Sequence, residues 1–371
     1  MSTIHWTEAD TELSADWYSE SSAPAPERIV LADDRTRADT AYRLACEGTT
    51  LLWRGDYHNA RQLLQAMGRR IDRKAPPPQS DPRDAFLAQR KLRGHRARVL
   101  SRLVVVLDET HALTLRRAPD VRQAWMEAHD GPDRPVAVSL TELLGVIGAH
   151  GWRVEGVPIP ALHARIHPHY GVFSPVRGEY VDLVANAPLP ADTRIAFDLG
   201  TGTGVLAAVL ASRGFERVIG TDISVRAVDC ARDNAARLGF ADRTQFLGPA
   251  LYPEGRADLI VCNPPWIPAR PTSTLEYGVY DAGGDMLQRF LDGLIEHLNP
   301  GGEGWLVLSD LAEHLGLRSR EQLLEQIAAA GLRVVGKLDT APQHPKASDA
   351  SDPLYAARSA EVTSLWRLTP A

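Results

Sequence analysis

The sequence has few cysteines and no long apolar run. Its 371 residues include only three cysteines, Cys46, Cys230 and Cys262, which are odd in number and far apart. That spacing suggests neither a disulfide framework nor a zinc site. No apolar run is long enough to cross a membrane, and the N-terminus lacks the basic-then-apolar pattern of a signal peptide. We therefore expect a cytoplasmic protein with no membrane contact.

The sequence also lacks an excess of positive charge. Its formal net charge is -6, which argues against a general nucleic-acid coat. One local exception lies between Phe86 and Arg102, where six basic residues occur without an acidic one: Arg90, Lys91, Arg93, Arg96, Arg98 and Arg102. Such a run can contact RNA phosphates or an acidic partner. It can equally be a solvated helix surface whose charges pair with nearby Asp and Glu.

The length and composition allow two domains. The chain is 44% hydrophobic and 24% charged, which suits a soluble globular protein with a substantial core. We predict an N-terminal α+β accessory domain over residues 1–155, with a role in substrate recognition, and a second domain over residues 156–371. Within the first we expect a loose arm (1–34), a small helical bundle (35–70), a linker with Pro76-Pro-Pro78 (71–84), a hairpin (103–115) and a helix or strand–helix pair (136–150).

The second domain alternates strands with helices. This pattern predicts an α/β fold, a doubly wound and mostly parallel sheet of seven strands. The expected strands are 194–198, 217–222, 244–247, 258–262 and 304–309, and the expected helices 205–213, 225–238, 286–298 and 318–330. Two last strands, 332–338 and 363–368, are expected to pair antiparallel at one edge of the sheet.

A glycine-rich turn follows the first of these strands. The strand Ile195-Ala-Phe-Asp198-Leu runs into Gly200-Thr-Gly202-Thr-Gly204 and then an apolar helix, a layout that holds nucleotide-like ligands in parallel sheets. Glycines let the backbone approach a ligand closely, and helix N–H groups attract a carboxylate or phosphate. The dinucleotide fingerprint would require Gly or Ala at position 205, which is Val. A nucleotide-dependent oxidoreductase is therefore disfavoured.

An acidic residue ends the second strand of this domain. Asp222 lies a little under twenty residues beyond Gly204, where a carboxylate can accept hydrogen bonds from both hydroxyls of a ribose. The alternative for Asp222 is helix capping, but Ser224 can do this instead. We interpret Asp222 as a ribose ligand.

Three histidines precede the glycine turn. His163, His167 and His169 could suggest a metal site, but Pro168 breaks helical register and no carboxylate or cysteine joins them at ligand spacing. We predict no metal. The same segment contains Tyr170 and Phe173, which we expect in a lid or entry loop over a ligand.

The sequence after the fourth strand narrows the chemistry. Asp258-Leu-Ile-Val-Cys262 is followed by Asn263-Pro264-Pro265-Trp266-Ile-Pro268, a rigid turn at the carboxyl edge of the sheet. Here the chain resembles the class I S-adenosylmethionine-dependent methyltransferases that carry an Asn-Pro-Pro-aromatic motif. Tyr280-Asp-Ala-Gly-Gly284-Asp285 and Leu298-Asn-Pro-Gly-Gly302 are also similar to the HemK-like protein-glutamine methyltransferases. The resemblance covers about residues 170–370.

The resemblance implies roles for the motif residues. S-adenosylmethionine would be the cofactor, held by Asp198, Gly200, Thr201, Gly202, Gly204, Asp222, Ile223 and Asn263, with Asp198 facing the ammonium group of its methionine part. The catalytic turn would be Asn263, Pro264, Pro265 and Trp266. Two departures stand out: Trp266 replaces the usual Tyr, and Gly248-Pro249-Ala250 lacks the acidic residue that often meets adenine. We therefore expect backbone groups and packing to hold the adenine.

The turn suits transfer of a methyl group to a planar nitrogen. The Asn263 side-chain oxygen and the Pro264 carbonyl can accept the two hydrogens of an amide or exocyclic amine, so that no strong base is needed. Trp266 can stack on a planar substrate or simply pack. We predict methylation of a protein glutamine side chain. The alternative is an adenine N6 or guanine N2 of RNA or DNA, and a non-catalytic binding module on the same fold is less favoured.

Overall fold

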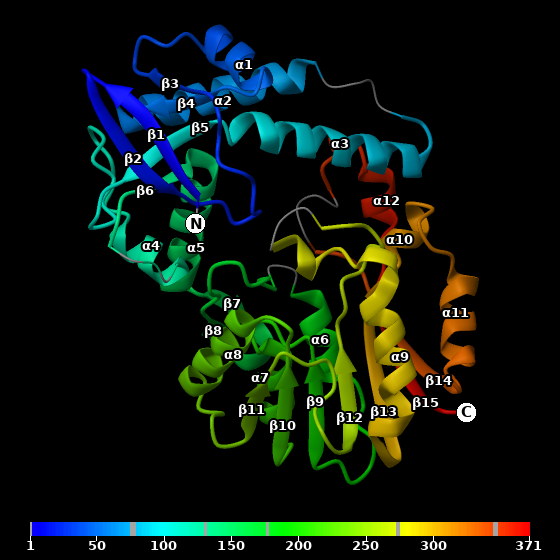
Figure 1. The fold of residues 1–371 in the computed structure, drawn as a ribbon. Helices are drawn as coiled ribbons and strands as arrows, with labels where there is room; N and C mark the ends of the chain where they lie inside the picture. The colour runs from blue at the N-terminus through cyan, green and yellow to red at the C-terminus, as the bar shows by residue number, and fades with distance from the viewer. Residues whose placement is uncertain are drawn as a thin grey trace. The chain divides into compact units, whose positions relative to one another are not determined.

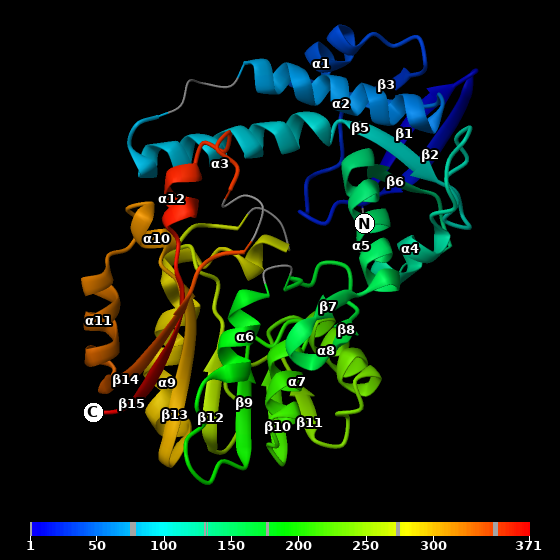
Figure 2. The same ribbon diagram turned by 180° about the vertical axis from the view of Figure 1, so that it is seen from behind.

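A computed structural model describes residues 2–74, 79–129, 131, 133–175, 178–271, 275–343 and 348–371. The chain divides into two compact units, whose elements are labelled in Figures 1 and 2. The first comprises Met1–Gln79 and Leu87–Gly151, and the second comprises Ser80–Phe86 and Trp152–Ala371. The predicted boundary after residue 155 lies close to this division. The sequence did not indicate that residues 80–86 belong to the second unit.

The first unit is built on one six-stranded sheet of order β1-β2-β6-β5-β4-β3. Strands β3, β4 and β5 are parallel, whereas β1 and β2 form an antiparallel pair and β6 runs antiparallel to β5. The elements are β1 (Ser2–Glu8), β2 (Thr11–Trp17), β3 (Ile29–Ala32), α1 (Ala38–Cys46), β4 (Thr50–Trp53), α2 (Tyr57–Arg73), α3 (Pro82–Leu100), β5 (Leu103–Leu107), α4 (Arg122–Ala128), β6 (Val136–Ser139) and α5 (Leu140–Glu155).

The central strands of this sheet, β4, β5 and β6, are buried on both faces. Leu51 and Trp53 of β4 face the main core, while Leu52 between them faces a smaller cluster with Ile4 and Ala15. This alternation is the period-two geometry of a strand. Helix α2 contributes an apolar stripe to the main core: Leu63, Leu64, Met67 and Ile71.

The prediction of a loose N-terminal arm over residues 1–34 was wrong. These residues form β1, β2 and β3, and Ile4 and Ala15 are buried. The segment looked polar because most residues of β1 and β2 are at least partly exposed, so its mean composition is that of a surface. Strand pairing, which composition does not reveal, holds it in the sheet.

Two other predictions for the first unit need correction. The stretch 35–70 is not purely helical, because Thr50–Trp53 is a strand, and a short apolar run is compatible with either structure. Residues 103–115 are not a hairpin: β5 pairs with β4 and β6, and beyond it only an isolated bridge joins Leu107 to Leu113. The strand–helix alternative for 136–150 is confirmed by β6 and α5. Pro76, Pro77 and Pro78 of the expected linker lie outside the described residues.

The basic run lies on α3 and at its C-terminal end, and part of it serves the fold. Arg96 donates to the carbonyl of Gly68 and to Asp72 on α2, the helix beside α3 in Figures 1 and 2. Arg102 contacts Thr50. Lys91, Arg93 and Arg98 are exposed. Part of the run is therefore paired within the fold, whereas Lys91, Arg93 and Arg98 remain on the surface, where they can contact phosphates or an acidic partner.

The second unit contains a seven-stranded sheet of order β11-β10-β9-β12-β13-β15-β14. Strands β9 to β13 are parallel, and β15 is antiparallel to both β13 and β14. This confirms the doubly wound sheet and the antiparallel edge pair. Its elements are α6 (Glu179–Asn186), β9 (Ile195–Leu199), α7 (Val205–Ser212), β10 (Arg217–Thr221), α8 (Val225–Arg237), β11 (Thr244–Leu247), β12 (Ala257–Cys262), α9 (Asp285–His297), β13 (Leu298–Ser309), α10 (Leu311–His314), α11 (Arg320–Ala329), β14 (Leu332–Thr340), α12 (Tyr355–Ala360) and β15 (Thr363–Pro370).

Short elements complete this unit. A small antiparallel pair precedes the sheet, and 3-10 turns flank it and the segment before α9: β7 (Val157–Ile159), η1 (Pro160–Leu162), β8 (Ala164–Ile166), η2 (Leu275–Gly278) and η3 (Ala282–Gly284). Among the described residues, no helix is long and apolar enough to span a membrane.

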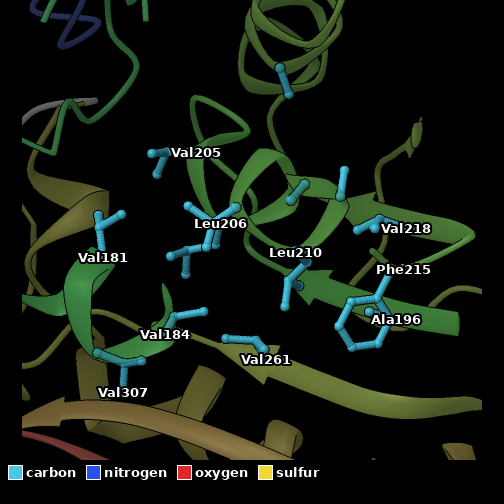
Figure 3. Packing of buried hydrophobic residues seen from close by; sticks show 14 of the residues in the cluster. Val181, Val184, Ala196, Val205, Leu206, Leu210, Phe215, Val218, Val261 and Val307 are labelled. Atoms are coloured by element: carbon cyan, nitrogen blue, oxygen red, sulfur yellow. The ribbon is translucent and has the colours of Figure 1, made fainter. Parts of the chain in front are cut away.

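Helices cover both faces of the second sheet. Helices α6, α7 and α8 pack on one face, where Ala196, Val218 and Val261 alternate with neighbours that point to α9 and α11 on the other. Figure 3 shows α7 residues Leu206 and Leu210 among the side chains of the first face. Every α7 residue from Val205 to Ala211 is buried, so its start is fixed firmly against the sheet.

Candidate active site

Three neighbouring parallel strands end level with one another. Leu199 of β9 pairs with Thr221 of β10 on one side and with Cys262 of β12 on the other. The next residues, Gly200, Asp222 and Asn263, therefore leave the sheet side by side at its carboxyl edge. Ligands of doubly wound sheets bind at this edge. The fold thus brings the three sequence motifs together.

The glycine turn has the backbone that its sequence predicted. Gly200, Gly202 and Gly204 have φ angles of 71°, 55° and 78°, in the left-handed region that glycine adopts readily. A Cβ on Gly200 would strike Met286, whereas one on Gly202 would have no atom nearer than 4.0 Å. The turn therefore packs against Met286 at Gly200 and has free space beside Gly202.

Asp198 organises the turn from inside the sheet. Its Oδ2 atom accepts hydrogen bonds from the Thr201 hydroxyl at 2.6 Å and from the Ala207 amide at 3.0 Å. The side chain is buried, and burial raises its pKa to about 6 against these two stabilising bonds. A buried carboxyl with a raised pKa gains from a cationic neighbour. The arrangement is compatible with the ammonium role predicted for Asp198.

Asp222 ties the turn to the second strand. Its Oδ2 accepts from the Gly202 amide at 3.0 Å and its Oδ1 from the Ser224 amide at 2.9 Å. Burial raises its pKa, and these amides act in the opposite direction. Ser224 caps α8 by accepting from Ala227, as expected. The Ile223 amide also bonds this carboxylate, so three amides leave it one lone pair for a ribose hydroxyl. The ribose role stays a prediction.

The segment after β11 lies against Asp222. The Ala250 amide donates to the Asp222 carbonyl, and a Cβ on Gly248 would overlap that same carbonyl. Ile223 is 66% exposed beside this backbone. An apolar side chain next to uncharged backbone is what the sequence predicted for an adenine site without an acidic residue.

The expected lid residues lie near the turn. The Phe173 ring packs against Gly278, and its carbonyl oxygen is one of the two atoms nearest to a Cβ on Gly202. Tyr170 lies under the guanidinium of Arg226 on α8. Among the histidines, His167 contacts the Arg153 carbonyl and His169 contacts Asp233. The segment thus reaches from α8 to the glycine turn.

Asn263 is held by two aromatic residues. The Trp266 indole N–H donates to Asn263 Oδ1 at 2.8 Å, and Tyr180 of α6 shares a hydrogen bond with the same side chain. Burial raises the pKa of Tyr180, so its hydroxyl stays neutral. The Tyr180 and Trp266 rings meet edge to face, with centroids 6.4 Å apart. The sequence pointed to Trp266 as a stacking platform and did not reveal either hydrogen bond.

The end of the Asn-Pro-Pro-Trp turn is also fixed. Ile267 forms a bridge with Tyr280, and its carbonyl accepts from the Asp281 amide at 2.9 Å. Phe86 packs in the same apolar cluster, with its ring centroid 6.4 Å from that of Tyr280. A segment far from the motif in sequence therefore supports it, which no local pattern could indicate.

The residues present fit the cofactor suggested by the sequence. A sulfonium-linked amino acid and nucleoside requires an anionic site, exposed amides, a hydroxyl acceptor and an apolar surface. Asp198, Asp222 and Ile223 can supply the anionic site, the hydroxyl acceptor and the apolar surface, and the space at Gly202 leaves room for the ligand backbone. The amides of Thr201, Gly202 and Gly204 already donate to Thr221, Asp222 and Thr201. In the described part of the chain, no cluster of metal-ligating residues occurs.

The raised pKa of Asp198 predicts how stability depends on pH. The folded value of about 6 lies above the ordinary 3.8, so the proton stabilises the folded state below about pH 4. This contribution, about 3 kcal/mol for two pKa units, is lost as the pH rises through 6. Asp198→Asn cannot titrate, so its melting temperature relative to wild type should rise by a few degrees between pH 5 and pH 8.

Calorimetry of the ligand-free protein measures this difference. Asp242→Asn, at an exposed carboxylate, is the matched control and should show no such trend. A difference between Asp198→Asn and wild type that stays constant with pH would contradict the raised pKa.

Comparison with known proteins gives this site a family. Residues 163–330 match the methyltransferase small domain. A release factor glutamine methyltransferase of Bradyrhizobium diazoefficiens is 38% identical over 123 residues, 29% of this chain and 41% of that protein. One from Chlorobaculum tepidum is 32% identical over 185 residues, 48% of this chain and 59% of that protein. A ribosomal protein L11 methyltransferase of Tolumonas auensis is 36% identical over 104 residues, 28% and 35% of the two chains.

The family match lies within the second unit. The chain spans less than two thirds of the length of these relatives, and the family description begins at residue 163. The cofactor of this domain is S-adenosylmethionine. Residues 163–330 thus form a class I S-adenosylmethionine-dependent methyltransferase domain, similar to the HemK-like enzymes.

Proposed function

We propose that the protein transfers a methyl group to the planar amide nitrogen of a glutamine side chain in a protein. The observation that carries this proposal is Asn263, which stands beside the glycine turn with its side-chain oxygen held by Trp266. An amide oxygen accepts two hydrogen bonds, and Trp266 uses one. The bond with Tyr180 lowers the pKa of that residue, so the Asn263 NH2 donates in it and the second lone pair of Oδ1 is left for a substrate N–H.

The chain's own residues mainly have to orient the acceptor. The cofactor supplies a methyl group already activated by its sulfonium. Asn263 Oδ1 and the Pro264 carbonyl can accept the two hydrogens of the acceptor amide and so direct its nitrogen lone pair. The same oxygens stabilise positive charge that develops on nitrogen. Trp266 and Tyr180 fix which way the Asn263 amide points, because an indole N–H can only donate.

The relatives support a protein acceptor. Those reported above are described as acting on release factors and on ribosomal protein L11, and both of these are proteins. The motifs of residues 280–302 that resemble the HemK-like enzymes point the same way. The first unit has no counterpart in the family match, and we assign it substrate recognition.

A second candidate is an exocyclic base amine, adenine N6 or guanine N2, in RNA or DNA. It is favoured by the exposed Lys91, Arg93 and Arg98 of α3, which can neutralise phosphates. Their effect is reduced because Arg96 of the same run already pairs with Asp72. The protein acceptor therefore stays the first choice.

Loss of the Asn263 side chain should abolish transfer and weaken cofactor binding only slightly, because Asn263 is one of several cofactor contacts. Asn263→Ala removes the acceptor for the substrate N–H, so we expect transfer to fall at least about a hundredfold. Binding of S-adenosylmethionine by calorimetry should change less than about threefold. Asn186→Ala, at an exposed asparagine on α6, is the control. Full activity in Asn263→Ala would remove the role given to Asn263.

Loss of the Asp222 charge should weaken cofactor binding. Asp222→Asn retains the shape of the side chain but gives up one hydroxyl acceptor, so we expect the Kd for S-adenosylhomocysteine to rise about tenfold or more. Asp242→Asn provides a surface control. Unchanged affinity, with an unchanged melting temperature, would refute the ribose assignment.

The substrate class is tested by labelling a cell extract. The protein is supplied with radiolabelled S-adenosylmethionine, and the products are treated separately with protease and nuclease. We expect protease to release the label and nuclease to leave it in place. Label that nuclease destroys would establish the base-methylating alternative instead. If no label is transferred although the protein binds S-adenosylmethionine, a non-catalytic binding module would be favoured.

A further inference from the structure

A cavity with a mixed polar and apolar lining opens next to the end of the Asn-Pro-Pro-Trp turn. It has a volume of about 450 Å³ and is lined by Pro268, by Gly283 and Gly284 of η3, and by side chains of α9 and α11. These two helices lie side by side in both views (Figures 1 and 2). The volume is within the range of ligand pockets, about 300–1,000 Å³. The cofactor residues described above do not line it.

Arg318 is the basic residue of this cavity, and two nitrogens of its guanidinium lack a hydrogen-bond partner. Its Nε and Nη2 atoms are shielded from water and have no hydrogen-bond acceptor among the residues that the structure describes. Burial lowers its pKa. A guanidinium that has lost water without gaining an acceptor destabilises the folded chain. An occupant with an oxygen acceptor would recover that energy.

The nearby carboxylates are engaged elsewhere. Glu313 and Asp281 both act on Arg318 through space. Glu313, however, accepts from Arg320 Nε at 2.9 Å, and Asp281 accepts from the amides of Met286 and Leu287 at the start of α9. Neither these carboxylates nor Glu325 in the cavity wall is hydrogen-bonded to Arg318 Nε or Nη2. An oxygen acceptor on an occupant of the cavity can therefore meet these two atoms.

The remaining side chains of the cavity suit a peptide ligand. Gln326 donates to Gln288 at 3.0 Å across the cavity, and Gln322 and Glu325 complete its polar wall. One positive and one negative side chain with three amides suit a polypeptide, which offers N–H and C=O groups in nearly equal number. A nucleic-acid backbone would call for an excess of positive charge.

We propose that this cavity binds a segment of the polypeptide acceptor, with Arg318 donating to a carboxylate or main-chain carbonyl of that segment. The proposal rests on the proposed function. Pro268 lies five residues beyond Asn263 in the chain, so the two are at most about 18 Å apart. The bound segment lies within about five residues of the methylated side chain.

Peptide binding tests the site without any methyl transfer. The probe is a fluorescein-labelled peptide, Glu-Glu-Ala-Gln-Ala-Glu-Glu, compared with its lysine counterpart, Lys-Lys-Ala-Gln-Ala-Lys-Lys, by fluorescence polarisation. We expect the acidic peptide to bind more tightly. Arg318→Gln should weaken it at least about tenfold, and Arg318→Lys, which retains the charge but loses the planar fork, by less. The control Arg237→Gln, at an exposed arginine of α8, should bind as wild type does.

Each failure has a distinct meaning. If the acidic peptide does not bind to wild type, the site is overturned. It is also overturned if Arg318→Gln and Arg318→Lys both bind the peptide with wild-type affinity. If Arg318→Gln weakens binding of an RNA oligonucleotide as much as it weakens binding of the acidic peptide, the peptide assignment is overturned. If wild type methylates protein and Arg318→Gln does so with the same KM, the proposed function stands and the site fails. If Arg318 governs peptide binding but wild type transfers no methyl group, the site stands and the proposed function fails.

Discussion

The level ends of β10, β9 and β12 are the constraint on which the second unit depends. Because Thr221, Leu199 and Cys262 share one register, the residue after each strand emerges beside the other two. The hydrogen bond from the Gly202 amide to Asp222 then joins the glycine turn to the neighbouring strand end. A slip of one residue in either pairing would turn each of these side chains to the opposite face. The register of the sheet therefore fixes the relative positions of the site residues.

Parts of this site were predictable because their cause is local. Glycine alone adopts the φ angles of Gly200, Gly202 and Gly204 without strain, and two successive prolines fix the turn after Asn263. The alternation of strands and helices likewise reports burial on two faces of a sheet. These features act within a few residues, so that the sequence carries them directly.

Other parts depend on contacts between distant segments. The hydrogen bonds that hold Asn263 come from Trp266 and from Tyr180 on α6, a helix that was not expected. Phe86, far earlier in the chain, packs beside the end of the turn. The first unit shows the same limit, because β1 and β2 are mostly exposed and only their pairing places them in the sheet. Composition and periodicity do not report such pairings.

Asp198 and Arg318, two buried charged groups, lower the stability of the ligand-free protein. Asp198 carries a raised pKa because burial outweighs its hydrogen bonds, and Arg318 lacks an acceptor among the described residues. Both costs fall when an oppositely charged or polar ligand arrives, which links binding to stability. The two groups mark different ligands: Asp198 lies at the glycine turn and Arg318 at the cavity beyond Pro268.

The central claim is that the carboxyl edge formed by Gly200, Asp222 and Asn263 holds the methyl donor. A crystal structure of the protein with S-adenosylhomocysteine tests it most directly. We expect ligand density over Gly202, with the ribose hydroxyls at the Asp222 carboxylate and the sulfur facing Asn263. Density elsewhere on the chain, or a ribose that makes no contact with Asp222, would contradict it.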